Sequence, residues 1–140
     1  MKIFISGSMA FSKEMKKVQK DLTDAGHEVV IPYGIEDHLE NPEFVDDLDN
    51  NFEYCLKTDV MRKCFDLVAA CDAVLVLNLP RKGIDGYMGT STLMEFALAY
   101  YLKKKLFLMH DVPSWNEVRW AHEIRIMQPT IIHGDLGKVK

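Results

Sequence analysis

Glu95 is the side chain that the sequence places best for chemistry. Its neighbours on both sides are apolar: Leu93, Met94, Phe96, Ala97, Leu98 and Ala99. A carboxylate with so few polar neighbours suits a nucleophile or a general base. Residues 92–95 also match a capping box, in which a glutamate folds back onto the first amide of its own helix. The sequence leaves both interpretations open.

Hydroxyl side chains precede the same apolar stretch. Thr90, Ser91 and Thr92 follow Gly89 and come just before the expected helix, where free N–H groups and the helix dipole favour an anion such as a phosphate. Ordinary N-capping explains hydroxyls at this place equally well. A second polar set, Ser6-Gly7-Ser8, follows the first expected strand, and its glycine either lets a ligand approach the backbone or simply turns the chain.

Cofactor and metal motifs are missing from the pattern. The first turn has the single glycine Gly7 and lacks both the three-glycine dinucleotide motif and the lysine of a phosphate-binding loop. The five histidines have no metal-ligand spacing. Cys64 and Cys71 would lie about 10 Å apart on a helix, too far for a disulfide or a shared metal, so with Cys55 we expect three free thiols. We therefore predict no cofactor and no metal.

The elements that must position these residues alternate between strands and helices. This alternation, with continuously apolar strands, predicts an α/β fold with a parallel sheet covered on both faces. We expect one doubly wound, Rossmann-like or flavodoxin-like domain over residues 1–140. Its five strands are expected at 2–6, 27–31, 73–77, 106–109 and 130–133, with helices up to Gly26 and near 52–70, 92–103 and 115–126.

Ligands of such sheets bind beyond the carboxyl ends of the strands. The turn after strand one and the loop at residues 78–91 after strand three should therefore meet on one rim, with His38 and His110 as the only histidines near it. The residues expected to contact the substrate are Ser6, Gly7, Ser8, Asn78, Asp85, Gly89, Thr90 and Ser91.

Charge is distributed unevenly along the chain. Residues 36–53 contain eight acids and no Lys or Arg, so this acidic segment carries −8 while the other 122 residues carry a net +4. Residues 32–51 are rich in Pro, Gly, Asn and Asp and are expected to form a long loop, which would serve as a mobile lid or an oligomer contact. The absence of a long basic stripe disfavours a nucleic acid polymer as partner.

Membrane and secretion signals are not predicted. No apolar run reaches the ~18 residues of a membrane span. The first eleven residues, MKIFISGSMAF, are read as a strand because no small-residue cleavage region follows them. A cytoplasmic location is the expectation.

Four stretches in order, KIFISG, DAVLVLN, GYMGTSTLMEFALAYYLKKKLFL and MQPTIIHGDL, resemble the nucleoside 2-deoxyribosyltransferase superfamily, including its 2′-deoxynucleoside 5′-monophosphate N-glycosidase branch. The resemblance covers nearly the whole chain outside the acidic segment. It implies that the Glu95 carboxylate attacks the anomeric carbon and that water or another base resolves the glycosyl-enzyme. It also implies a homo-oligomer, a homodimer or larger, in which a neighbouring chain helps to close each pocket.

A second carboxylate assists the leaving base in that family, and here the sequence departs from the pattern. The family places this acid eight residues before the aspartate that opens strand three, and counting back from Asp72 gives Cys64. Asp59 is expected nearer to the ligand edge than Asp66, so we predict Asp59 as the assisting acid. Asp85 is the alternative.

The sequence thus predicts an enzyme that cleaves the N-glycosidic bond of a nucleoside or nucleoside 5′-monophosphate, or transfers its deoxyribosyl group. The hydroxyl groups on the rim favour a nucleotide. One alternative is a nucleotide-binding or sensor domain without catalysis. Another is a phosphoribohydrolase similar to the cytokinin-activating family, whose longer glycine motif is missing here.

Overall fold

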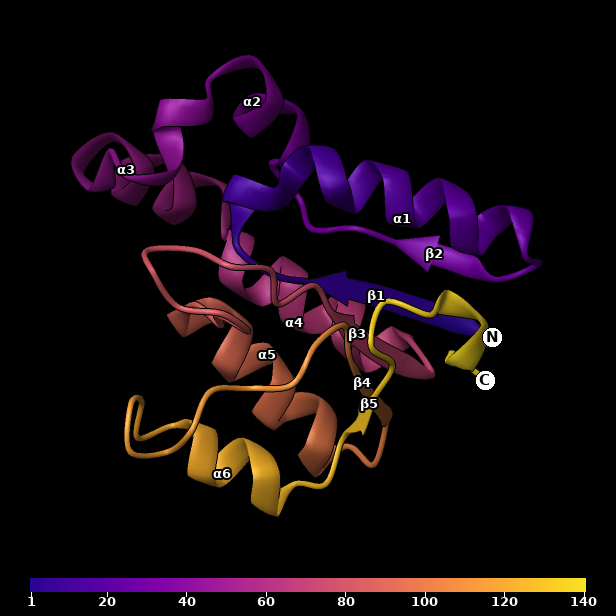
Figure 1. The fold of residues 1–140 in the computed structure, drawn as a ribbon. Helices are drawn as coiled ribbons and strands as arrows, with labels where there is room; N and C mark the ends of the chain where they lie inside the picture. The colour runs from indigo at the N-terminus through magenta and orange to yellow at the C-terminus, as the bar shows by residue number, and fades with distance from the viewer.

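A computed structural model describes residues 1–140 and contains one sheet of five parallel strands in the order β2-β1-β3-β4-β5 (Figure 1). The predicted α/β fold with a doubly wound, five-stranded parallel sheet is therefore confirmed. That residues 1–140 form a single domain stays a prediction. The strands are β1 (Lys2–Ser6), β2 (Glu28–Val30), β3 (Ala73–Val76), β4 (Lys105–Leu108) and β5 (Thr130–Ile131).

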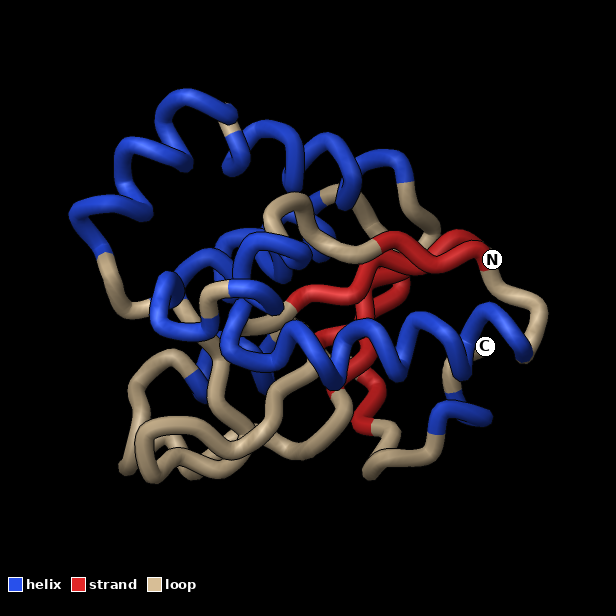
Figure 2. Tube along the Cα trace, turned by 90° about the horizontal axis from the view of Figure 1, so that it is seen from above, coloured by secondary structure: helices blue, strands red, loops and turns tan.

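Helices cover both faces of the sheet, as Figure 2 shows from above. Two 3-10 turns, η1 and η3, follow β1 and β5, and a third, η2, lies between α2 and α3. No helix is both long and apolar enough to span a membrane. The helices and turns are α1 (Ser12–Asp24), α2 (Ile35–Glu40), α3 (Leu48–Thr58), α4 (Val60–Ala70), α5 (Thr90–Tyr101), α6 (Ala121–Ile126), η1 (Met9–Phe11), η2 (Pro42–Val45) and η3 (Leu136–Lys138).

The middle positions of the central strands are apolar because each of their two faces is buried. In β1, Ile3 and Ile5 join the core under α1, while Phe4 joins the core shared by α4, α5 and α6. In β3, Leu75 belongs to the first core and Val74 to the second. This alternation follows from the two-residue period of a strand, and it explains why the sequence reads as continuous apolar runs.

The acidic segment is not the long loop that the sequence predicted. It folds into α2, η2 and the first part of α3. The Gly, Asn and Pro residues of the expected loop at 32–51 mark the ends of short helices: Gly34 precedes α2 in the left-handed region at φ 91°, and Asn41-Pro42 separates α2 from η2. The sequence prediction was wrong because helix-breaking residues that recur every few positions leave room for helices of one or two turns.

The single helix expected at 52–70 is two helices. Asp59 adopts a left-handed conformation, φ 51° and ψ 42°, and separates α3 from α4. The last helix is also shorter than expected, because α6 begins at Ala121 rather than near residue 115. Both differences change which side chains reach the rim of the sheet.

Candidate active site

A cavity of about 550 Å³ lies at the carboxyl edge of the sheet, where the sequence predicts the ligand. Its walls come from the turn after β1, the residues after β2, the acidic segment, α4 and the first turns of α5. The cavity is therefore built from segments far apart in the chain, and Glu95 is among its lining residues.

Glu95 lies in the second turn of α5 and is only 6% exposed. The Ser6 hydroxyl donates a hydrogen bond to its Oε1 over 3.3 Å, whereas its buried Oε2 has no hydrogen-bond partner. The capping-box interpretation is wrong, because Gly89 is the N-cap of α5 and Thr92 is already its third residue. An unpaired buried carboxylate oxygen is costly, and such groups are concentrated at functional sites.

Burial raises the pKa of Glu95 from 4.5 to about 7, and the hydrogen bond from Ser6 opposes part of that rise. Desolvation dominates because taking the charged form out of water is expensive. Near neutral pH the side chain is therefore present in both its acid and its carboxylate form. A group poised in this way is suited to nucleophilic or acid–base chemistry.

The N-terminus of α5 borders the same cavity. Gly89, Thr90 and Ser91 line it, and no side chain caps this helix end. The first backbone bond of the helix runs from the Leu93 N–H to the Gly89 carbonyl, so the preceding N–H groups have no acceptor within the helix. This arrangement offers several donors to an anion.

Gly7 and Ser8 also line the cavity. A Cβ added to Gly7 would lie 3.1 Å from both the Leu77 carbonyl oxygen and the end of the Met15 side chain, so packing alone requires a small residue there. The Ser8 hydroxyl accepts a hydrogen bond from the Ala10 N–H and caps η1. Both residues thus have structural tasks in addition to any contact with a ligand.

Four other predicted site residues do not line the cavity. Ser6 lies fully buried behind Glu95. Asn78 is also buried, and its amide exchanges two hydrogen bonds with the backbone of His110, which fixes the loop after β3 to the loop after β4. Asp85 borders a separate small hollow beside Asp111. The fourth residue is Asp59.

Asp59 is placed close to the cavity, but its side chain is exposed. Its neighbours Val60 and Met61 line the cavity, as expected from the direction of α4. The carboxylate itself forms an ion pair of 3.2 Å with Arg62, and the side chain is 61% exposed. The structure therefore does not bring Asp59 and Glu95 together. Asp66, the other aspartate of this region, is also exposed and lies outside the lining.

Asp46 is the second carboxylate that lines the cavity, and the sequence analysis missed it. The Arg81 guanidinium donates to its two oxygens over 3.1 and 3.3 Å. Arg81 also lies 5.7 Å from the centre of the Tyr87 ring. The basic pair Arg81-Lys82 in the loop after strand three was the available signal, because cations in a loop of the ligand rim attract a nearby acidic segment.

Cys64 lines the cavity at the position where the resembled family has its assisting acid. Burial, with a smaller contribution from the charge of Glu95, raises the pKa of the thiol to about 11. Cys64 is therefore neutral near pH 7 and is a weak proton donor. It and the other two cysteines are free thiols.

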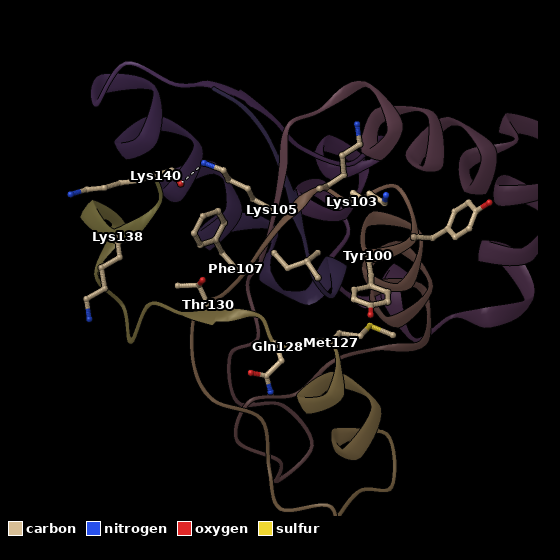
Figure 3. Close-up of a pocket in the computed structure, with 12 residues that line it drawn as sticks. Tyr100, Lys103, Lys105, Phe107, Met127, Gln128, Thr130, Lys138 and Lys140 are labelled. Carbon is tan, nitrogen blue, oxygen red and sulfur yellow. Dashed lines mark hydrogen bonds between the residues drawn. The ribbon is translucent and has the colours of Figure 1, made fainter.

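A larger hollow of about 840 Å³ lies at the opposite edge of the sheet, around the start of β4 (Figure 3). Five lysines line it, and none of them pairs with a carboxylate. The Lys105 ammonium donates instead to the Lys140 carbonyl oxygen over 3.0 Å. No acid, histidine or cysteine borders this hollow, so it is not the candidate active site. The lysines are Lys103, Lys104, Lys105, Lys138 and Lys140.

No family model matches this chain, and no curated protein matches it. Among solved structures, the chain is similar to the CMP N-glycosidase BcmB of Clostridium botulinum, with 15% sequence identity and a TM-score of 0.48. The match covers 94% of this chain and 85% of that chain. Neither the fold nor the site described above depends on this similarity, because the fold follows from the strand order and the site from its own distances and burial.

Proposed function

We propose that this protein cleaves the N-glycosidic bond of a nucleoside 5′-monophosphate, with Glu95 as the nucleophile. The observation that carries the proposal is the Glu95 carboxylate: it is buried beside a cavity, one oxygen is held by Ser6, and the other oxygen is unpartnered. The sequence resemblance to nucleoside 2-deoxyribosyltransferases points to the same residue.

The chemistry has two steps. The ionised Glu95 attacks the anomeric carbon, and the electron pair of the C1′–N bond leaves with the base, which takes up a proton. Water then attacks the same carbon, the carboxylate leaves, and a proton is released, so that the net products are free base and sugar phosphate. A second base in place of water would make the reaction a transfer.

The N-terminus of α5 is the proposed phosphate site. Thr90 and Glu95 are five residues apart on one helix, which is about 7.5 Å along its axis. A sugar phosphate can therefore place its phosphate at the free N–H groups and its anomeric carbon near the carboxylate. Arg81 and Lys82 add positive charge at the same cavity.

Binding without catalysis is the second candidate function, and one observation favours it. The predicted assisting acid, Asp59, is exposed and paired with Arg62, while Cys64 is a neutral thiol. Asp46 is the other carboxylate that lines the cavity, and its pairing with Arg81 must loosen before it can donate a proton. Comparing Asp59→Asn with Asp46→Asn identifies which carboxylate assists, if the enzyme is active.

The test is release of free base from a panel of ribo- and deoxyribonucleoside 5′-monophosphates, followed by chromatography. We expect the wild-type protein to release base and Glu95→Gln to lose at least ~100-fold in rate while keeping its fold and its nucleotide affinity. Unchanged release by Glu95→Gln would show that the nucleophile is misassigned. Nucleotide binding without release by either form would favour the second candidate function.

A further inference from the structure

His38 is a buried cavity residue that the proposed chemistry does not use. It belongs to α2, within the acidic segment, which the family resemblance does not cover. The side chain is 6% exposed and lines the same cavity as Glu95. Its Nδ1 lies 2.9 Å from the Gly34 carbonyl oxygen, and its ring lies 5.2 Å from that of Phe44.

The contact with Gly34 determines which ring nitrogen carries the proton. A carbonyl oxygen only accepts hydrogen bonds, so Nδ1 must be the donor. In the neutral ring, Nε2 then has a free lone pair and acts as an acceptor. This Nε2 is buried and has no partner in the protein. Glu95 Oε2 also has no partner, so two residues that line one cavity each have a buried polar atom without a hydrogen bond.

The two residues belong to opposite walls. Ile35 of α2 packs in the core on the α1 face of the sheet, whereas Phe96 of α5 packs in the core on the other face. Figure 1 shows α2 and α5 on the two sides of the carboxyl edge. A nucleotide with its phosphate at the start of α5 and its sugar at Glu95 must extend its base toward the α2 wall.

That wall has the surface expected for a planar base. Tyr33 and Tyr54 line it together with Val45 and His38. Aromatic and aliphatic side chains supply flat apolar contacts, and a few fixed polar groups then select the ligand. On this wall, His38 Nε2 is a buried acceptor without a partner. A small movement of the side chain must open it to the cavity, and its counterpart on a ligand must then be an N–H or O–H donor.

We propose that His38 Nε2 accepts a hydrogen bond from the exocyclic amino group of the base, so that the site selects amino-bearing bases over their oxo counterparts. The inference rests on the proposed function, which places the sugar at Glu95. An oxo group would direct its own lone pair at Nε2 and leave the buried acceptor unpaired. Sites built on such a hydrogen bond discriminate strongly against analogues that lack the donor.

The experiment measures equilibrium binding to the Glu95→Gln protein, in which nucleotides stay intact. CMP is compared with UMP, and AMP with IMP, because each pair differs by an amino against an oxo group. His38→Phe removes the acceptor but keeps a ring beside Phe44. His122→Phe is the matched control, because His122 lies outside the cavity.

We expect CMP and AMP to bind about 10- to 100-fold more tightly than UMP and IMP. His38→Phe should abolish this preference by weakening the amino nucleotides, while His122→Phe preserves it. Equal binding within each pair, or a preference that survives His38→Phe, would overturn the inference and leave the proposed function standing. Binding of none of the four nucleotides would overturn both.

A spectroscopic measurement keeps the inference falsifiable if His38→Phe does not fold. In ¹⁵N-histidine NMR of the Glu95→Gln protein, the His38 ring should show a protonated Nδ1 and an unprotonated Nε2. The Nε2 resonance should shift on addition of CMP and not on addition of UMP. The opposite tautomer, or the same response to both nucleotides, would refute the assignment. A response that follows ribose against deoxyribose would assign Nε2 to a sugar hydroxyl and also refute it.

Discussion

Replacing Glu95 by Gln is expected to raise the free energy of unfolding. This gain should appear only above about pH 4.5, the ordinary pKa of a glutamate. The pKa of this carboxyl is about 7 in the folded protein against an ordinary value of 4.5. Each pKa unit corresponds to about 1.4 kcal/mol, so the difference of roughly 2.5 units amounts to about 3 kcal/mol. Glutamine has nearly the same shape and carries no charge, which leaves this contribution as the main difference.

The pH range follows from the direction of the shift. Below about pH 4.5 the carboxyl is protonated in both the folded and the unfolded chain, and burial of Glu95 carries no charge penalty. Between about pH 4.5 and 7 the unfolded chain ionises while the folded protein retains its proton, so the wild type loses stability relative to the variant. Above pH 7 the folded form ionises too, and the difference levels off.

Urea denaturation of both proteins from pH 4 to pH 9 measures this difference directly. We expect the unfolding free energies to agree at the acidic end and to differ by about 3 kcal/mol at pH 8, in favour of the variant. Glu14→Gln is the control, because Glu14 is exposed, makes no ion pair and should show no such trend. A difference that is constant across the pH range, or a wild type that is the more stable form at pH 8, would refute the reasoning.

Three further changes test the site and the loop between β3 and α5. Ser6→Ala removes a hydrogen bond that lowers the pKa of Glu95, so the midpoint of base release against pH should move upward; an unchanged midpoint would contradict the assigned contact. Cys64→Asp places a second carboxylate beside Glu95 and should raise the pH midpoint above that of the wild type through like-charge repulsion, whereas Cys64→Ser should not. Equal pH profiles for the two variants would argue against the proximity of residue 64 and Glu95. Gly86→Ala should lower the free energy of unfolding in urea by about 2 kcal/mol or more, since φ is +72° and the added Cβ would clash with the backbone carbonyl oxygen of Asp111 in the loop after β4. Gly83→Ala, at φ +75° with open space around it, should cost only about 1 kcal/mol, and equal losses at the two glycines would exclude the steric explanation.

The sequence predicts the sheet well because its central strands are buried on both faces. Continuous apolar runs such as β1 are recognisable without knowledge of their neighbours, and β1 begins and ends at the predicted residues. Parallel strands then place their carboxyl ends on one edge, and this was enough to predict that the start of α5 and the turn after β1 line the same cavity.

The remaining features of the site depend on contacts that no local pattern contains. Asp46 and Arg81 are 35 residues apart and meet only because the acidic segment folds into helices over the rim. Asp59 was expected near the ligand from the direction of its helix, but its left-handed backbone turns the carboxylate toward Arg62. His38 Nε2 is an acceptor because Nδ1 donates to the Gly34 carbonyl oxygen, and the sequence does not show this contact.

The lysine-lined hollow and the acidic segment lie at opposite edges of the sheet. Five lysines that pair with no acidic side chain border the amino edge of the sheet, and the acidic segment, residues 36–53, lies over the carboxyl edge (Figure 1). The net charge of −4 therefore combines a group of lysines at one edge of the sheet with an excess of acids at the other. At low ionic strength the protein should be retained on both cation- and anion-exchange resins, each time by a different end of the molecule.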